Sequence, residues 1–234
     1  GKTYYGYGIK VVTSGDIELS NVTADKNNVF GAYLEGINVR VSGGSFSDNG
    51  TGNLADHIGK GLEIVSTGGG LVNVSNVTAS NNQLFGANIK ADGGALVIIS
   101  NSIFNGNKSY KYAAGSTTYD GYGIKVVATD GTIYVNGVEA NENYRFGAHL
   151  EGASVDVGLS TFNFNISPIQ KNKAPSGRGL EVISTGDTSL WSVVANDNQI
   201  FGASIQSGGK VQVVSSIFAR NTYTYLCGCE TRTG

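Results

Sequence analysis

Methionine is absent from this chain of 234 residues, and proline and cysteine occur only twice each. The two cysteines, Cys227 and Cys229, give no disulfide framework, so packing must hold the fold. The longest apolar run, from Ala95 to Ile99, is far too short for a membrane-spanning helix, and no membrane insertion is expected. The 16 Lys and Arg residues are scattered among 18 Asp and Glu residues, which argues against nucleic acid as a partner. The lack of an initial Met and of a signal-like opening segment indicates a processed product or an excerpt of a longer chain.

Glycine, in contrast, is abundant, although 35 residues fall well short of the one in three that collagen needs. A glycine-containing segment at 6–12, Gly-Tyr-Gly-Ile-Lys-Val-Val, returns unchanged at 121–127. Close variants of other segments return at nearly the same spacing. We therefore predict one continuous structure built from two tandem copies, approximately 1–120 and 121–234.

Each copy divides further into coils with the same internal pattern. In the first coil, Ile-Lys-Val at 9–11 and Ile-Glu-Leu at 17–19 precede an asparagine-rich corner at 27–28. Such alternation is typical of strands with one buried face, and a unit this short must stack on its neighbours to bury that face. We predict an all-β, single-stranded parallel β-helix of about eight coils. The motifs of leucine-rich repeats and calcium-binding nonapeptide rolls are missing, and propeller blades have longer, antiparallel strands.

One motif also resembles a known family. The pattern Asn-Val-Thr-Ala-x-x-Asn-x-x-Phe-Gly-Ala, as at 21–32, resembles the right-handed parallel β-helix repeats of the pectin-lyase-like superfamily. It is most similar to the tandem-repeat regions of large bacterial surface and secreted proteins. The resemblance implies a right-handed helix and an extracellular or cell-surface location, and it specifies architecture rather than activity.

Stacking assigns each position of a coil to a column. One inward column is predicted to alternate large and small side chains, namely Ile9, Ala32, Leu62, Ala87, Ile124, Ala148, Leu180 and Ala203. Two sets of phenylalanines are predicted to form ladders in the core: Phe30, Phe85, Phe146 and Phe201, and Phe46, Phe104, Phe162 and Phe218. Asparagines are predicted to turn the corners and to bond along the axis: Asn27, Asn49, Asn81, Asn107, Asn141, Asn163, Asn196 and Asn221. Trp191 is interpreted as packing at a corner rather than as a sugar platform.

The outward face of the first strands carries the charged side chains. Polysaccharide lyases and galacturonases of the superfamily have clustered Asp with Lys or Arg in one groove, for calcium, substrate carboxylates and proton abstraction. The nearest constellation here comprises Glu35, Glu63, Lys10 and Lys90, and it returns as Glu151, Glu181 and Lys125. Because an active site is usually single, the repetition indicates a solvated face with charge pairs across coils. We predict no catalytic residue, no cofactor and no metal site, since neither His57 nor His149 has a ligand-like spacing.

Insertions follow every second corner, at 50–58, 108–120, 166–176 and from 222 onward, and all are expected at one edge. Exposed tyrosines there suit contact with carbohydrate or protein, and the alternative is that the rings pack against their own loops. The cysteines are either free thiols or form disulfides between chains or repeats. The candidate contact residues are Tyr4, Tyr5, Tyr110, Tyr112, Tyr119, Tyr223, Tyr225, Cys227 and Cys229.

These observations favour a non-enzymatic extracellular β-solenoid that serves as a surface fibre, stalk or adhesin segment. The start of the chain and the segment after Asn221 both match the loop between the copies. We therefore expect the chain to stack head to tail on itself, or on adjacent repeats of a longer chain, and to form filaments. The alternative is a carbohydrate-active or carbohydrate-binding β-helix, lyase-like or tailspike-like, with glycans as partners. An acidic or Asp/Arg cluster confined to one copy would favour that alternative, and the sequence shows none.

Overall fold

The computed structural model of the chain describes residues 6–50, 59–108, 121–167 and 176–223. These residues contain no helix, and the strands pair with one another in parallel, as in a parallel β-helix. The strands are β1 (Tyr7–Val12), β2 (Ile17–Thr23), β3 (Phe30–Gly36), β4 (Val39–Ser45), β5 (Lys60–Ser66), β6 (Leu71–Ser75), β7 (Phe85–Ala91), β8 (Leu96–Ser100), β9 (Tyr122–Asn136), β10 (Phe146–Gly158), β11 (Arg178–Ser184), β12 (Thr188–Trp191), β13 (Ala203–Ser207) and β14 (Val211–Val214). None of the described elements is a helix long and apolar enough to cross a membrane.

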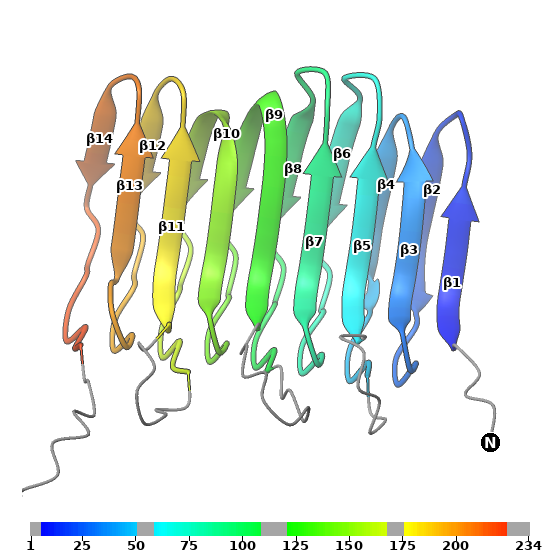
Figure 1. The fold of residues 1–234 in the computed structure, drawn as a ribbon, viewed down its shortest axis with the longest axis horizontal. Coiled ribbons are helices and arrows are strands. Elements are labelled where there is room, and N and C mark those ends of the chain that lie inside the picture. Colours follow the sequence, from blue (N-terminus) through cyan, green and yellow to red (C-terminus); the bar gives the residue numbers. More distant parts are fainter. Residues whose placement is uncertain (1–5, 51–58, 109–120, 168–175, 224–234) are drawn as a thin grey trace, which may run out of the picture.

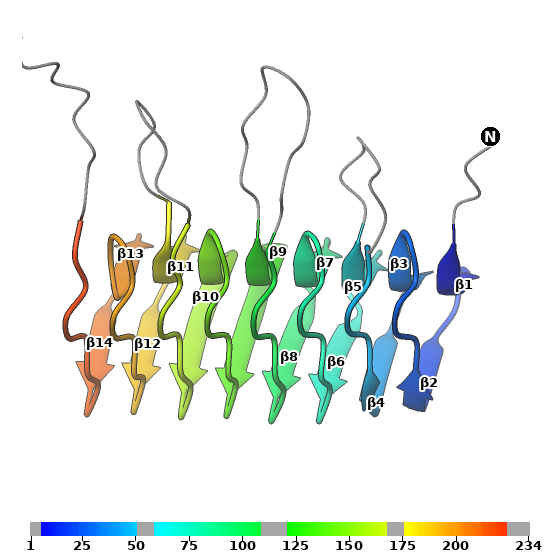
Figure 2. The ribbon, with the colours of Figure 1, turned by 90° about the horizontal axis from the view of Figure 1, so that it is seen from below.

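The strands lie in two layers, seen edge-on in Figure 2. The front layer of Figure 1 runs β1-β3-β5-β7, then the first part of β9 and of β10, then β11 and β13. The back layer runs β2-β4-β6-β8, then the second part of β9 and of β10, then β12 and β14. A third side is one residue wide and consists of isolated parallel bridges from Ser45 to Ile217.

The predicted inward column of the front layer is confirmed residue for residue. Ile9 pairs with Ala32, Ala32 with Leu62, and the series continues through Ala87, Ile124, Ala148 and Leu180 to Ala203. From Ala32 to Leu180 these side chains have no solvent exposure. Large and small residues thus alternate on successive coils, which lets their side chains interdigitate in the interior. The boundary between the two copies remains a prediction.

The two sets of phenylalanines lie in different environments. Phe46, Phe104 and Phe162 are fully buried, as predicted for a core ladder, whereas Phe218 is 38% exposed. The prediction is wrong for Phe30, Phe85 and Phe146 of the other set, whose rings lie beneath cations on the outer face of the front layer, and these cations leave Phe146 only 2% exposed. Phe201 is 46% exposed. A glycine follows each ring, and a Cβ at Gly31 would lie 2.6 Å from the carbonyl oxygen of Gly61, so this close approach admits only glycine. The ring of Phe30 beside it contacts Tyr33 and Lys60, which belong to the outer face.

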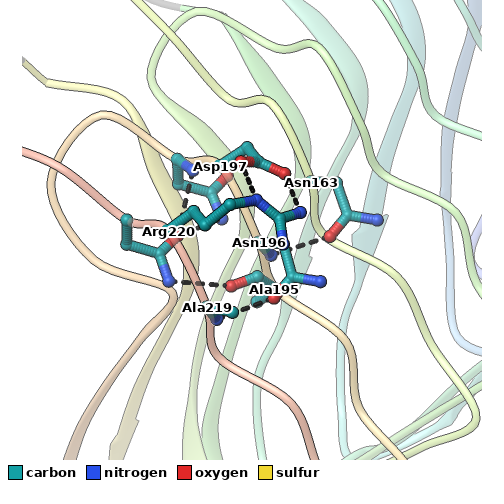
Figure 3. A network of polar contacts seen from close by, with 8 residues as sticks. Asn163, Ala195, Asn196, Asp197, Ala219 and Arg220 are labelled. Atoms are coloured by element: carbon teal, nitrogen blue, oxygen red, sulfur yellow. Dashed lines mark hydrogen bonds and ion pairs between the residues drawn. The ribbon is translucent and has the colours of Figure 1, made fainter.

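The asparagine ladder exists, but half of its members differ from the prediction. Each buried carboxamide accepts hydrogen bonds from the asparagine of the coil before it, in the order Asn27, Asn49, Asn82, Asn107, Asn143, Asn165, Asn198 and Asn221. Asn81 instead occupies a turn with φ of 57°. Asn141, Asn163 and Asn196 belong to a second, more exposed ladder (Figure 3). Since these bonds satisfy backbone donors at every corner, the ladder fixes the register between coils.

The last corner of the solenoid is tied to the preceding corner by charge. Arg220 donates from Nε to Asp197 Oδ1 at 2.7 Å and from Nη2 to Oδ2 at 2.6 Å (Figure 3). Hydrogen bonding to Arg220 holds the pKa of Asp197 below its ordinary value. The pair therefore joins two successive coils most strongly when the carboxyl group is ionised.

Candidate functional site

The outer face of the front layer begins with a column of aromatic rings and cations. Parallel pairing places one residue of each coil in this column, in the order Tyr7, Phe30, Lys60, Phe85, Tyr122, Phe146 and Arg178. The rings of Tyr122 and Phe146 stack with centroids 5.0 Å apart, the distance that the spacing of parallel strands imposes. The rings form a platform, and cations lie over it.

In the first copy the cation at the centre of this column is Lys60. Its Nζ lies 5.1 Å from the ring centroid of Phe30 and 5.7 Å from that of Phe85. The same Nζ lies 2.6 Å from Glu63 Oε2, while Asn88 donates to Glu63 Oε1 at 2.7 Å. Glu63 is thus paired with Lys60, whereas the sequence analysis placed Lys10 and Lys90 near it.

In the second copy the corresponding part of this face carries more charged side chains. Arg178 lies over Phe146 with Cζ 5.0 Å from the ring centroid, and Arg145 lies over Phe146 and Tyr122 at 5.6 and 5.4 Å. Lys125 adds a third cation, 5.7 Å from the centroid of Tyr122. Next to them, His149 Nδ1 is 2.7 Å from Glu181 Oε2. We call Lys125, Arg145, His149, Arg178 and Glu181 the second-copy cluster.

The copies differ at two residues of this face that matter for chemistry. Where the second copy has Arg145, the first has Val29, which is buried. Where the second copy has His149, the first has Tyr33, whose hydroxyl donates to Glu35 Oε2 at 2.8 Å. That hydrogen bond, then burial and the nearby carboxylates, raises the pKa of Tyr33, so the phenol stays a proton donor.

The imidazole of His149 is oriented by its hydrogen bond to Glu181. Glu181 accepts from Nδ1–H, and Arg178 Nη1 lies 3.7 Å from the other carboxylate oxygen, Glu181 Oε1. With Nδ1 protonated, Nε2 is the nitrogen left to take up a proton. The side chain of His149 is 15% exposed, which leaves part of it within reach of a ligand. A carboxylate that orients a histidine is a recurring arrangement in acid–base catalysis.

The candidate contact residues of the sequence analysis mostly fall outside the described residues. This applies to Tyr4, Tyr5, Tyr110, Tyr112, Tyr119, Tyr225, Cys227 and Cys229. Tyr223 is described and is 60% exposed. The sequence analysis missed Arg145 and Arg178 because each stands where a strand begins: Arg145 directly precedes β10, and Arg178 is the first residue of β11. Alignment of the two copies contained the signal, since Arg145 replaces Val29 and His149 replaces Tyr33.

Two carboxylates of this face are already engaged by protein groups. Glu63 is paired with Lys60 and Asn88, and Glu181 with His149 and Arg178. Within the described ranges no group of three or more His, Cys, Asp or Glu side chains is placed to hold a metal ion. These donors do not fit the calcium that the resemblance implies, and the roles assigned below belong to the side chains of the chain itself.

Comparison with known proteins supports the fold. No known protein family and no curated protein sequence matches the chain. Among solved structures, pectate lyase Pel9A matches with a TM-score of 0.56 and 18% sequence identity, over 87% of this chain and 54% of the lyase chain. The matched region thus spans about half the length of that lyase.

The match corrects one expectation and confirms another. The prediction that the chain is not an enzyme is wrong on this comparison, because the solved structure that shares its fold is a lyase. The prediction had taken a constellation repeated in both copies as a solvated face, but the copies diverge at Arg145 and His149. The resemblance to the pectin-lyase-like superfamily is confirmed at the level of architecture: the chain has the pectin-lyase-like parallel β-helix fold.

Proposed function

We propose that this chain is a carbohydrate-active β-helix that binds an acidic polysaccharide, a polyuronate, on the outer face of the front layer. The observation that carries the proposal is the second-copy cluster, in which three cations surround a histidine oriented by a carboxylate. The pectate lyase with the same fold supports the substrate class, since pectate is a polyuronate.

Binding follows from the charges of the cluster. Lys125, Arg145 and Arg178 outnumber the carboxylates of Glu181 and of Glu151, which stands two residues after His149 on the same face, so the cluster attracts anions. The fork of an arginine matches the two oxygens of a uronate carboxylate. The rings of Tyr122 and Phe146 fix the cations from below and so reduce the loss of side-chain entropy when the ligand binds.

The same residues support cleavage by β-elimination. The cations withdraw charge from the uronate carboxylate, which makes the proton on the adjacent carbon, C5, more acidic. His149 Nε2 accepts that proton, and the electron pair of the C–H bond forms a double bond between C4 and C5. The bond from C4 to the glycosidic oxygen breaks, and that oxygen takes a proton from water. Glu181 stabilises the imidazolium formed on His149.

The test is the rate at which polygalacturonate gains double bonds, followed by ultraviolet absorbance. The wild type is expected to be active, and His149→Gln is expected to lose about 100- to 10,000-fold in kcat because a general base contributes that much. Tyr33→Phe, the matched change in the first copy, is expected to leave the rate unaltered. An inactive wild type would overturn the cleavage step, and equal losses in both variants would overturn the role of His149.

A secreted or cell-surface location follows as part of this proposal, because polyuronates are extracellular polymers.

Stacking of a further coil is a second proposal and is favoured by the coil of β13 and β14. That coil exposes Val211, Val213 and Ile217 at 47%, 47% and 54%, an apolar surface that water disfavours. The coil that covers it belongs to a second copy of this chain or to adjacent repeats of a longer one.

A further inference from the structure

The outer face of the back layer departs from the repeat in its second half. In the first copy the outward positions carry Glu18 on β2, Arg40 on β4 and Ser75 on β6, whereas the second copy has Tyr134 on β9, Asp156 on β10 and Trp191 on β12. Asp156 pairs with Tyr134 of the preceding coil, so these two side chains are neighbours.

Trp191 is held in one orientation without being buried. Its indole lies over Gly158, the residue opposite it on β10, where a Cβ would overlap the ring. The indole Nε1 donates to Asp156 Oδ1 at 2.9 Å, and the residue keeps 36% of its surface exposed. Trp191 is the last residue of β12 and precedes the turn at Ser192, whose φ is 53°, so the indole packs on Gly158 at a corner and is also partly exposed there. The side chain lies flat on the outer face of the back layer.

Two hollows adjoin this arrangement, and Asp156 lines both. The first has a volume of about 290 Å³ and is lined by Tyr134, Asn136, Asp156 and Trp191, among others. The second, of about 220 Å³, shares Tyr134 and Asp156 and adds Ser154, Asp187, Lys210 and Gln212. Tyr134 is 45% exposed, so an aromatic ring lines both hollows.

We infer that this surface, the Trp191 surface, binds a neutral oligosaccharide. Sugars present apolar C–H faces that pack on aromatic rings and hydroxyl groups that need paired acceptors and donors, and the surface offers both. Asp156, Asp187 and Gln212 offer acceptors to sugar hydroxyls and Lys210 offers donors, while the Ser154 hydroxyl already donates to Thr132 Oγ1 at 3.1 Å. A polyuronate is disfavoured here because its carboxylates would meet those of Asp156 and Asp187. The polyuronate is thus assigned to the front layer and the neutral oligosaccharide to the back layer.

The chain provides its own reporter, because Trp191 is the only tryptophan. Cellohexaose, xylohexaose, mannohexaose and maltohexaose are titrated separately into the whole chain while tryptophan emission is followed. At least one is expected to shift the emission and to saturate, whereas hexagalacturonate is not expected to do so. For Tyr134→Ala, which keeps the reporter, binding is expected to weaken at least tenfold.

Because the variant Trp191→Ser lacks the fluorescent reporter, its binding is measured by calorimetry. Trp191→Ser, which restores the residue of the first copy, is expected to abolish the heat of binding, and circular dichroism verifies that it folds. Ser75 lies on β6 outside the surface, so Ser75→Ala serves as the matched control and is expected to bind like the wild type. No response to any neutral hexasaccharide, or equal binding by Trp191→Ser, would overturn the inference. Neither result bears on polygalacturonate cleavage at the front layer.

Discussion

Replacement of Asn107 by alanine removes one rung from the middle of the buried asparagine ladder. The Asn107 carboxamide has no solvent exposure, and its Oδ1 accepts from the backbone N–H of Asn82 at 3.0 Å and from Asn82 Nδ2 at 3.2 Å. Its Nδ2 donates to Phe104 O and to Asn143 Oδ1, both at 3.0 Å. Asn107→Ala therefore leaves two buried donors of Asn82 without their acceptor.

The expected cost follows from those two donors. Each buried donor left unsatisfied costs about 1–3 kcal/mol, so the free energy of unfolding is expected to fall by about 4 kcal/mol. For a chain of this size, that corresponds to a melting temperature about 8–16 °C lower, measured by far-ultraviolet circular dichroism.

Asn105→Ala is the matched control. Asn105 Oδ1 accepts one bond, from the partly buried backbone N–H of Asn141 at 2.7 Å, so its loss is expected to lower the melting temperature by only about 2–4 °C. A melting temperature of Asn107→Ala no lower than that of Asn105→Ala would contradict the claim that the buried ladder fixes the register between coils.

Three further predictions concern charge, packing and assembly. The ionised carboxyl group of Asp197 stabilises the fold, because its pKa is lower in the folded state than the ordinary value of 3.8. The free energy of unfolding is therefore expected to fall as the pH drops from about 3.8 through that lowered pKa. Hydrogen exchange of the Asp197 amide is expected to rise over that range in the wild type and to change less in Arg220→Gln. Gly158→Ala is expected to displace the indole of Trp191 and to shift its emission to longer wavelength, which unchanged emission would contradict. Light scattering is expected to show association that Val211→Lys together with Val213→Lys suppresses, and a concentration-independent monomer would refute the stacking.

Much of the fold could be predicted because strand alternation determines it. Ile9 and Leu62 were placed in the right column since every second residue of a parallel strand faces the interior. Corners were harder, because their geometry does not follow a period of two. Phe30 lies on the outer face although it stands two residues before the inward Ala32, and of the adjacent Asn81 and Asn82 only Asn82 is buried, while Asn81 has a φ of 57°.

The candidate site was predictable only in part. The repeated Glu63 and Glu181 were recognised, but repetition was read as evidence against chemistry. Arg178 and Glu181 are three residues apart on β11, and the structure adds Arg145 and His149 from the coil before. Which side chains cross from one coil to the next depends on rotamers and on the aromatic platform beneath them, and neither is visible in the sequence.

The central claim is that the second-copy cluster, rather than its first-copy counterpart, binds the polyuronate. The most direct test compares the Kd of hexagalacturonate for Lys125→Gln and for Lys10→Gln, the same position in the two copies, by calorimetry. Because Lys125 stands among the cations around His149, its loss is expected to weaken binding about tenfold, while Lys10→Gln is expected to stay within about twofold of the wild type. Equal effects of the two substitutions, or a wild type that binds no hexagalacturonate, would contradict the account.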